Sequence, residues 1–302
     1  MSAALSVMLW PLVACLALPG ILVYYGLHIV RREVIFVDLA LAQVAALGFS
    51  LAVLLGHGAH DPAAYGLSLV FTFIGAAIFT LTRMRDRRVP QEALIGIVYV
   101  VAAAAGILVL SQSAEGNEEL RRTLVGDVLL VRGGEVWRTF ALYAAIGAVH
   151  FAFRRQFLKL SFQPERAFAE GMAVRGWDFA FYALFGLVVT SFVQIGGVLL
   201  VFSYLIVPAV VANLLVGSLA ARLAAGWITA TLGSVLGLGL SYALDLPTGA
   251  AIVCVLGGLL LAGGLAARLG RRLSATGDAG SGAGAAGAPA GTCSARSRPG
   301  RR

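Results

Sequence analysis

Asp38 and Gln43 are two polar residues near the start of an apolar run, VDLALAQVAALG, that covers residues 37–48. A carboxylate is a good ligand for a hard or borderline divalent cation, whereas an amide oxygen is a poor ligand for zinc. The two residues lie roughly 140° apart around a helix, so they share one face only if the helix is distorted. Three roles are open for Asp38: to line a cation pathway, to pair with Arg31 or Arg32, or to cap the helix. Gln43 is expected either to contact the metal or to face the interior of a helical bundle.

A second group of possible ligands, His57, His60 and Asp61, lies in the short sequence HGAHD. Imidazole nitrogen and carboxylate oxygen suit a divalent transition metal, so this loop could hold a metal at the entrance of a pathway. A solvated polar loop is the alternative. Cysteine chemistry is not indicated, because Cys15, Cys254 and Cys293 do not form a CxxC pair.

The sequence has no catalytic signature. It contains no GxxxxGK[ST] loop, no HExxH, no GxSxG and no paired-carboxylate arrangement. We therefore predict a non-catalytic chain with no permanently bound cofactor, and movement of a substrate is a better hypothesis than catalysis.

The elements that must position these residues are membrane helices. Hydrophobic residues make up 59% of the 302 residues and charged residues only 13%, whereas a soluble domain is about 25% charged. The net charge of +8 fits Lys and Arg in cytoplasmic loops. Because the Arg residues interrupt apolar runs and form no basic face, we expect membrane lipid and no nucleic acid as a partner.

Charge-free runs predict the individual spans, because about 20 apolar residues cross a bilayer as a helix. The run 179–221 is twice that length, and Gln194-Ile195-Gly196-Gly197 near its middle predicts a turn. We predict an all-α, polytopic transmembrane bundle of about nine spans, with eight possible. The runs are 1–30, 39–60, 62–82, 93–114, a shorter one at 139–153, two within 179–221, 223–244 and 246–267.

The distribution of basic residues predicts the orientation. With the N-terminus outside, 19 of the 23 Lys and Arg residues fall on the cytoplasmic side. His28 and His150 then lie near the inner ends of their spans, where we expect interfacial positions. Glu92 begins a span and is expected to pair with Arg87 or Arg88 or to snorkel. We predict a permease domain over 1–272 and a disordered, cytoplasmic Gly/Ala/Ser/Arg-rich tail over 273–302.

The segment SFQPERAFAEGM, residues 161–172, lies on the cytoplasmic side and predicts a short helix. Pro164 suits the first turn of a helix and Gly171 suits the position after its end. It is either an ordinary interfacial helix or a coupling helix that inserts into a partner. The coupling residues would be Pro164, Glu165, Ala167, Phe168, Gly171 and Met172.

Six segments, in this order, resemble the permeases of ABC-type importers for zinc, manganese or iron: VRREVIFVDLALAQVAALG, QEALIGIVYVVAAAAGILVL, LVGDVLLV, LKLSFQPERAFAEGM, VQIGGVLLVFSYLIVPAVVANLL and LDLPTGAAIV. The resemblance runs from about residue 20 to residue 265. It implies a homodimer in a bacterial cytoplasmic membrane, a cytoplasmic ABC ATPase that receives the coupling helix, and an extracytoplasmic metal-binding protein. It also implies that a divalent metal is the transported substrate and that the partner ATPase uses the ATP. Alternatives are a permease for an iron–siderophore or vitamin, a gradient-driven secondary transporter, and a membrane anchor.

The resemblance breaks at the metal-binding motif. The family's segment reads like GDALSHA, and Asp38, Leu39 and Gln43 fall on its Gly, Asp and His. Both positions that supply ligands in the family are therefore changed.

Three further residues are candidates for outer-face or gating roles. Asp127 and Asp245 are expected to face the binding protein, although Asp245, followed by Pro247, could instead start the last helix. Pro208 lies within a span, where it is expected to kink the helix and free a carbonyl.

Overall fold

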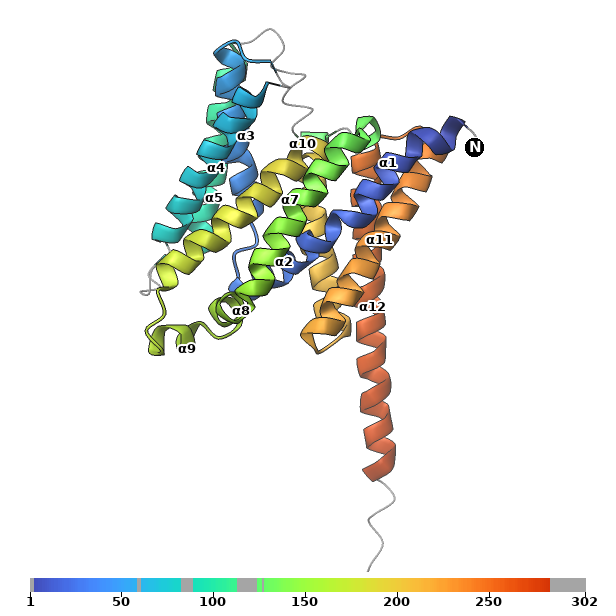
Figure 1. Ribbon diagram of the computed structural model, residues 1–302. Helices are drawn as coiled ribbons and strands as arrows, with labels where there is room; N and C mark the ends of the chain where they lie inside the picture. The colour runs from blue at the N-terminus through green and yellow to red at the C-terminus, as the bar shows by residue number, and fades with distance from the viewer. Residues whose placement is uncertain (1–2, 59–60, 83–88, 113–123, 127, 283–302) are drawn as a thin grey trace, which may run out of the picture.

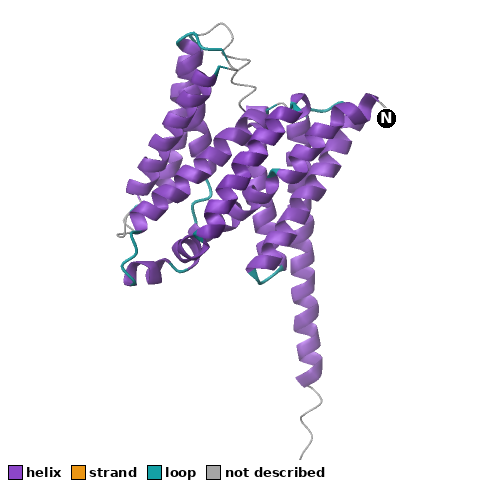
Figure 2. Ribbon diagram, viewed as in Figure 1, coloured by secondary structure: helices purple, strands orange, loops and turns teal. Residues whose placement is uncertain are grey.

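The computed structural model describes residues 3–58, 61–82, 89–112, 124–126 and 128–282. Throughout these residues the regular structure is helical and there is no strand (Figure 2), which confirms the predicted all-α bundle. The elements are α1 Ala3–Ala17, α2 Pro19–Arg32, α3 Val37–Leu54, α4 Pro62–Thr82, α5 Gln91–Leu110, η1 Val128–Leu130, α7 Gly133–Ala152, α8 Arg154–Phe162, α9 Pro164–Ala169, α10 Val174–Leu215, α11 Leu219–Leu244 and α12 Thr248–Gly282.

Helix α10 is broken at Gly197, which confirms the predicted turn. Gly197 has φ 73° and ψ 168°, a conformation that glycine adopts without steric cost. A Cβ on Gly197 would lie 2.4 Å from the backbone nitrogen of Gly126. Figure 1 shows the chain running up to this point and then back down the bundle. The two halves of the 42-residue helix are thus separate spans.

The span count follows from this break. In the described residues, seven helices are long and apolar enough to cross a membrane, or eight if α7 and α8 form one bent span. That count takes α10 once, so dividing it at Gly197 gives eight spans, or nine if α7 and α8 together make one more, which are the two counts that the sequence predicts. The span predicted at 139–153 is longer than its charge-free run, because α7 begins at Gly133.

The two ends of the bundle differ. We call the end that holds α8 and α9 the inner end, and the opposite one the outer end (Figure 1). Helix α8 is bent by 79° from α7 and so lies across the inner end. The predicted boundary at residue 273 falls within α12, which continues to Gly282, while residues 283–302 lie outside the described part.

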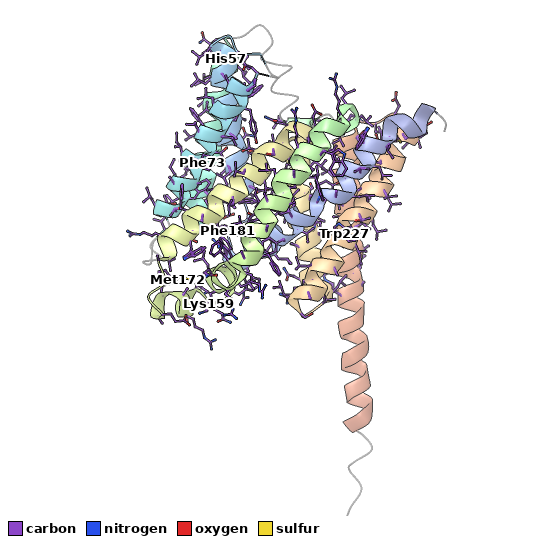
Figure 3. All side chains as sticks on the ribbon, viewed as in Figure 1. His57, Phe73, Lys159, Met172, Phe181 and Trp227 are labelled. Atoms are coloured by element: carbon purple, nitrogen blue, oxygen red, sulfur yellow. The ribbon has the colours of Figure 1, made fainter. Side chains whose placement is uncertain are left out.

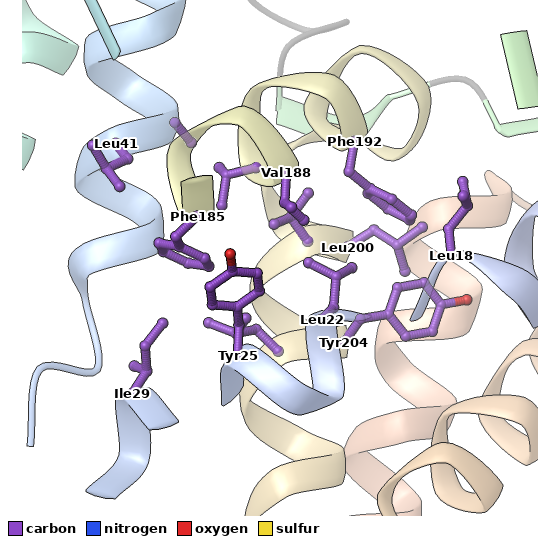
Figure 4. Packing of buried hydrophobic residues seen from close by; sticks show 14 of the residues in the cluster. Leu18, Leu22, Tyr25, Ile29, Leu41, Phe185, Val188, Phe192, Leu200 and Tyr204 are labelled. Atoms are coloured by element: carbon purple, nitrogen blue, oxygen red, sulfur yellow. The ribbon is translucent and has the colours of Figure 1, made fainter. Parts of the chain in front are cut away.

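The core surrounds α10 and α2. Tyr25, Phe185 and Tyr204 are fully buried there, and Figure 4 shows Tyr25 beside Phe185. Helix α2 crosses the second half of α10 at backbone contact, since a Cβ on Gly26 would lie 1.9 Å from the carbonyl oxygen of Leu205. The central helix therefore contacts α2, α3 and α4 as one packed unit.

Candidate functional site

Asp38 lies in the first turn of α3 with 1% of its surface exposed. Neither carboxylate oxygen has a hydrogen-bond partner. A buried carboxylate without a partner is costly, so this group is suited to receiving a cation or a proton.

The predicted alternatives for Asp38 are wrong. Arg32 pairs instead with Asp178 of α10, with Nη1 3.0 Å from Oδ1. The N-cap of α3 is Phe36, which makes no side-chain capping bond. The guanidinium of Arg32 also lies over the ring of Phe181, 3.7 Å from the centroid.

Glu92, in the first turn of α5, lies near Asp38 and acts on it electrostatically. Its Oε1 accepts a hydrogen bond of 3.0 Å from the backbone N–H of Phe36, and its Oε2 is buried without a partner. The predicted partners Arg87 and Arg88 lie outside the described residues. Three carboxylate oxygens without a hydrogen-bond partner thus lie in the first turns of α3 and α5.

Gln43 is buried one turn further along α3, in a different environment. Together with Ser50, Gly106 and Leu110 it lines a cavity of about 20 Å³ between α3 and α5. This volume is enough for one water molecule. Leu39 packs against the apolar core. The two positions that carry ligands in the family motif therefore do not join Asp38 in one cluster.

At the outer end, His57 Nδ1 lies 2.9 Å from Asp61 Oδ2 (His57 is labelled in Figure 3). The N–H of Ala63 also donates to Asp61, and these two contacts hold the pKa of this exposed carboxyl below its usual range. His60 lies outside the described residues. Within the part of the chain that the structure describes, no three His, Cys, Asp or Glu side chains are grouped to hold a metal.

The three outer-face or gating candidates have separate outcomes. Asp127 lies outside the described residues. Asp245 is exposed and ends α11 as a left-handed C-cap, so it does not start α12, which begins at Thr248. Pro208 is buried in the second half of α10, and the break in that helix lies at Gly197.

The predicted short helix is α9, and both of its predicted end signals are present. Pro164 occupies its first turn. Gly171 has φ 69°. The N–H of Met172 donates to the carbonyl of Ala167, and the N–H of Gly171 donates to that of Phe168. This pair of bonds is the Schellman motif that ends a helix.

Helix α9 is attached on one side and open on the other. Ala167 is buried against Leu160 of α8 and Val174 of α10, with Met172 beside them. Glu165 is exposed, and Phe168 is 43% exposed. Met172 and Lys159 lie at the inner end in Figure 3, opposite His57. An exposed phenylalanine on a short, firmly seated helix is suited to insertion into a partner.

His28 and His150 are not interfacial, contrary to prediction. Both are buried. His28 Nδ1 lies 2.7 Å from Ser161 Oγ, and His150 Nε2 lies 2.7 Å from Tyr25 Oη. Sequence reasoning missed Ser161 and Asp178, whose partners lie more than 120 residues away in the chain.

The chain is similar in sequence to membrane proteins of metal transport systems and similar in fold to a solved structure. The sequence profile described as the ABC 3 transport family matches residues 4–267. The manganese transport system membrane protein MntC of Listeria innocua is 33% identical over 190 residues, which cover 61% of this chain and 68% of the relative. The "Probable iron transport system membrane protein" of Haemophilus influenzae is 29% identical over 203 residues, 67% of this chain and 73% of the relative. Among solved structures, PsaBC from Streptococcus pneumoniae in complex with Fab matches with a TM-score of 0.72 at 24% identity, covering 85% of this chain and 90% of that one.

Proposed function

The chain belongs to the ABC 3 transport family, and on that premise we propose that it is the permease subunit through which an ATP-driven importer moves a divalent transition metal ion into the cytoplasm. It is a multi-pass bacterial membrane protein and a non-catalytic subunit. Relatives named for manganese and iron transport support a metal cargo. Zinc stays a third possibility on the same ligand chemistry.

The observation that carries the proposal is the buried, unpartnered carboxylate of Asp38 beside Glu92. Oxygen donors of this kind suit manganese and iron(II) better than they suit a large organic cargo. A cation that reaches the inner end would pair with oxygens that have no other partner. Asp38 and Glu92 are therefore the proposed metal-contacting residues. Gln43, with Ser50, would serve as a polar step further out, and His57 and His60 would lie at the entrance.

Coupling to ATP hydrolysis is assigned to α9. Its open side presents Phe168 and Glu165 at the inner end, and its buried side is fixed to α8 and α10 through Ala167. We propose that a cytoplasmic ABC ATPase binds this open side. An extracytoplasmic metal-binding protein would dock at the outer end, where Asp245 is exposed.

A second copy of the chain is the proposed permease partner. Helix α5 exposes Ile97, Val100, Val101 and Leu108, all of them apolar. Such a surface needs lipid or protein to cover it. In a homodimer, the surface not facing the second copy would face membrane lipid.

The test is ATP hydrolysis by the purified complex. The full chain, its co-encoded ATPase and the binding protein are reconstituted, and hydrolysis is measured with metal-free and with metal-loaded binding protein. We expect the metal-loaded binding protein to stimulate ATP hydrolysis more than the metal-free one. Failure of the ATPase to co-purify with the chain would overturn it. Stimulation by a siderophore-loaded or vitamin-loaded binding protein, but not by manganese, iron or zinc, would reassign the cargo.

A further inference from the structure

Arg32, the last residue of α2, joins three helices at the inner end. Its Nε donates to Ser161 Oγ of α8 at 2.8 Å, and its Nη1 donates to Asp178 of α10 at 3.0 Å. The guanidinium also lies over Phe181 of α10. The side chains of Arg32 and Asp178 are 4% and 1% exposed, so this is an interior joint and not a surface ion pair.

Ser161 is the link on the α8 side. Its hydroxyl lies between His28 and Arg32, which are one turn apart on α2. Ser161 is itself buried, so neither bond is shared with solvent. A displacement of the end of α8 must therefore either break two hydrogen bonds or carry the end of α2 with it.

Helix α8 is in turn fixed to α9. Leu160 packs against Ala167, and Lys159 pairs with Glu170 just after α9. Phe157 is fully buried and stacks on His150, with ring centroids 4.0 Å apart. Because close-packed side chains transmit displacement with little slack, α8 and α9 are expected to move as one body.

The other side of the joint leads to the acidic residues. Helix α2 ends at Arg32, Glu33 follows in the left-handed conformation, and α3 begins at Val37 with Asp38 in its first turn. Within this short connection the N–H of Phe36 donates to Glu92. The turn 33–36 thus ties the end of α2 to both carboxylates.

This proposal rests on the premise that the chain is a permease driven by an ATPase bound at α9. We propose that Arg32 and Ser161 are positioning residues that transmit movement of α8 and α9 to the turn 33–36. The turn in turn moves Asp38 and Glu92. Neither residue contacts the metal in this role. The contacts of Arg32 and Ser161 couple the ATPase-binding helix α9 to the metal-contacting residues Asp38 and Glu92, because both places are connected to the end of α2.

The first test measures metal ions taken up per ATP hydrolysed, in liposomes holding the full complex. Ser161→Ala removes both hydrogen bonds to α2 and leaves the partners of the Arg32–Asp178 pair in place. It is expected to lower this ratio at least about fivefold, the lower end of typical coupling between two sites. The isosteric Asp178→Asn is expected to lower it in the same direction. Ser234→Ala is the matched control, since Ser234 is a buried serine of α11 that bonds Tyr204 of α10 and the carbonyl of Cys15 of α1.

The second test does not depend on the cargo. Phe36→Cys, at an exposed position, is introduced into a chain lacking native cysteines, and its labelling by a thiol reagent is followed with and without a non-hydrolysable ATP analogue on the bound ATPase. Nucleotide is expected to change the labelling rate, and Ser161→Ala to abolish that change. Labelling that responds equally in both chains, or in neither, would overturn the proposal. Nucleotide-dependent labelling that Ser161→Ala abolishes, in a complex that imports no metal, would refute the metal cargo and still support the positioning role of Arg32 and Ser161.

Discussion

Arg32 and Asp178 form a buried ion pair between the end of α2 and the start of α10, although 146 residues separate them in the chain. Removing one partner of such a pair leaves the other charge in a medium that solvates it poorly. Asp178→Ala is therefore expected to cost about 3–5 kcal/mol of stability. The measurement is thermal unfolding of the purified chain in detergent. Asp245→Asn, at an exposed position whose left-handed backbone asparagine also adopts, is the control and should leave the unfolding temperature nearly unchanged. An equally small effect for both variants would contradict an energetically significant pair.

Substitution of Asp38 should affect thermal stability in the opposite way to substitution of Asp178. Because its carboxylate is buried without a partner, Asp38→Asn removes a group that is costly to bury. We expect the variant to unfold at the same temperature as the parent chain or at a higher one. A clear loss of thermal stability would mean that Asp38 has a structural partner, and would argue against its role as a receiver of the cargo.

Gly197 is the residue on which the hairpin of α10 depends. Gly197→Ala places a Cβ 2.4 Å from the nitrogen of Gly126 at a positive φ, and is expected to cost at least about 2 kcal/mol. Expression level and detergent unfolding report the effect. Gly239→Ala is the control, since Gly239 lies within α11 with no atom near its added Cβ. It should be neutral or slightly stabilising, and a similar loss at both sites would contradict the turn.

Phe168 is expected to be an anchor for the ATPase. Phe168→Asp places a charge in the proposed contact and should weaken ATPase binding by about 2–4 kcal/mol, which is thirtyfold or more. Co-purification and a binding titration measure the loss. Phe168→Leu keeps an apolar side chain and should retain most of the affinity. An intact, active complex with Phe168→Asp would remove the coupling role from α9.

The loop at the outer end should respond to acid. The N–H of Ala63 and the side chain of His57 hold the pKa of Asp61 below its ordinary value of 3.8. The local stabilisation is therefore present above pH 3.8 and is lost as the pH falls through the lowered value. Hydrogen exchange at the Ala63 amide, corrected for its intrinsic rate, should accelerate in that range. Asp61→Asn should lack this pH dependence, and a parent chain without it would contradict the contact.

Local sequence signals predicted the features that depend on local geometry. Pro164 and Gly171 define α9 because one lacks an N–H and the other accepts a positive φ. Gly196-Gly197 predicted the break in α10 because glycine also accepts the positive φ that Gly197 adopts there. Hydropathy alone predicted the spans, since a bilayer requires long apolar helices.

The partners of the polar residues could not be predicted in the same way. Arg32 is six residues from Asp38 but pairs with Asp178, because the packing of α2 on α10 decides which carboxylate it reaches. Glu92 accepts from the backbone of Phe36, a contact that no charge pattern in the sequence indicates. Charge and spacing do not encode such long-range contacts, and the acidic pair at the inner end became visible only once α3 and α5 were placed together.

The most direct test of the central claim is uptake of radioactive manganese, iron(II) or zinc into liposomes that contain the full chain, its ATPase and the metal-loaded binding protein. We predict ATP-dependent accumulation of at least one of these ions by the parent chain, and its loss in Asp38→Asn with the ATPase still bound. The account would be contradicted if none of the three ions accumulated above an ATP-free control, or if Asp38→Asn and the parent chain took up metal at the same rate.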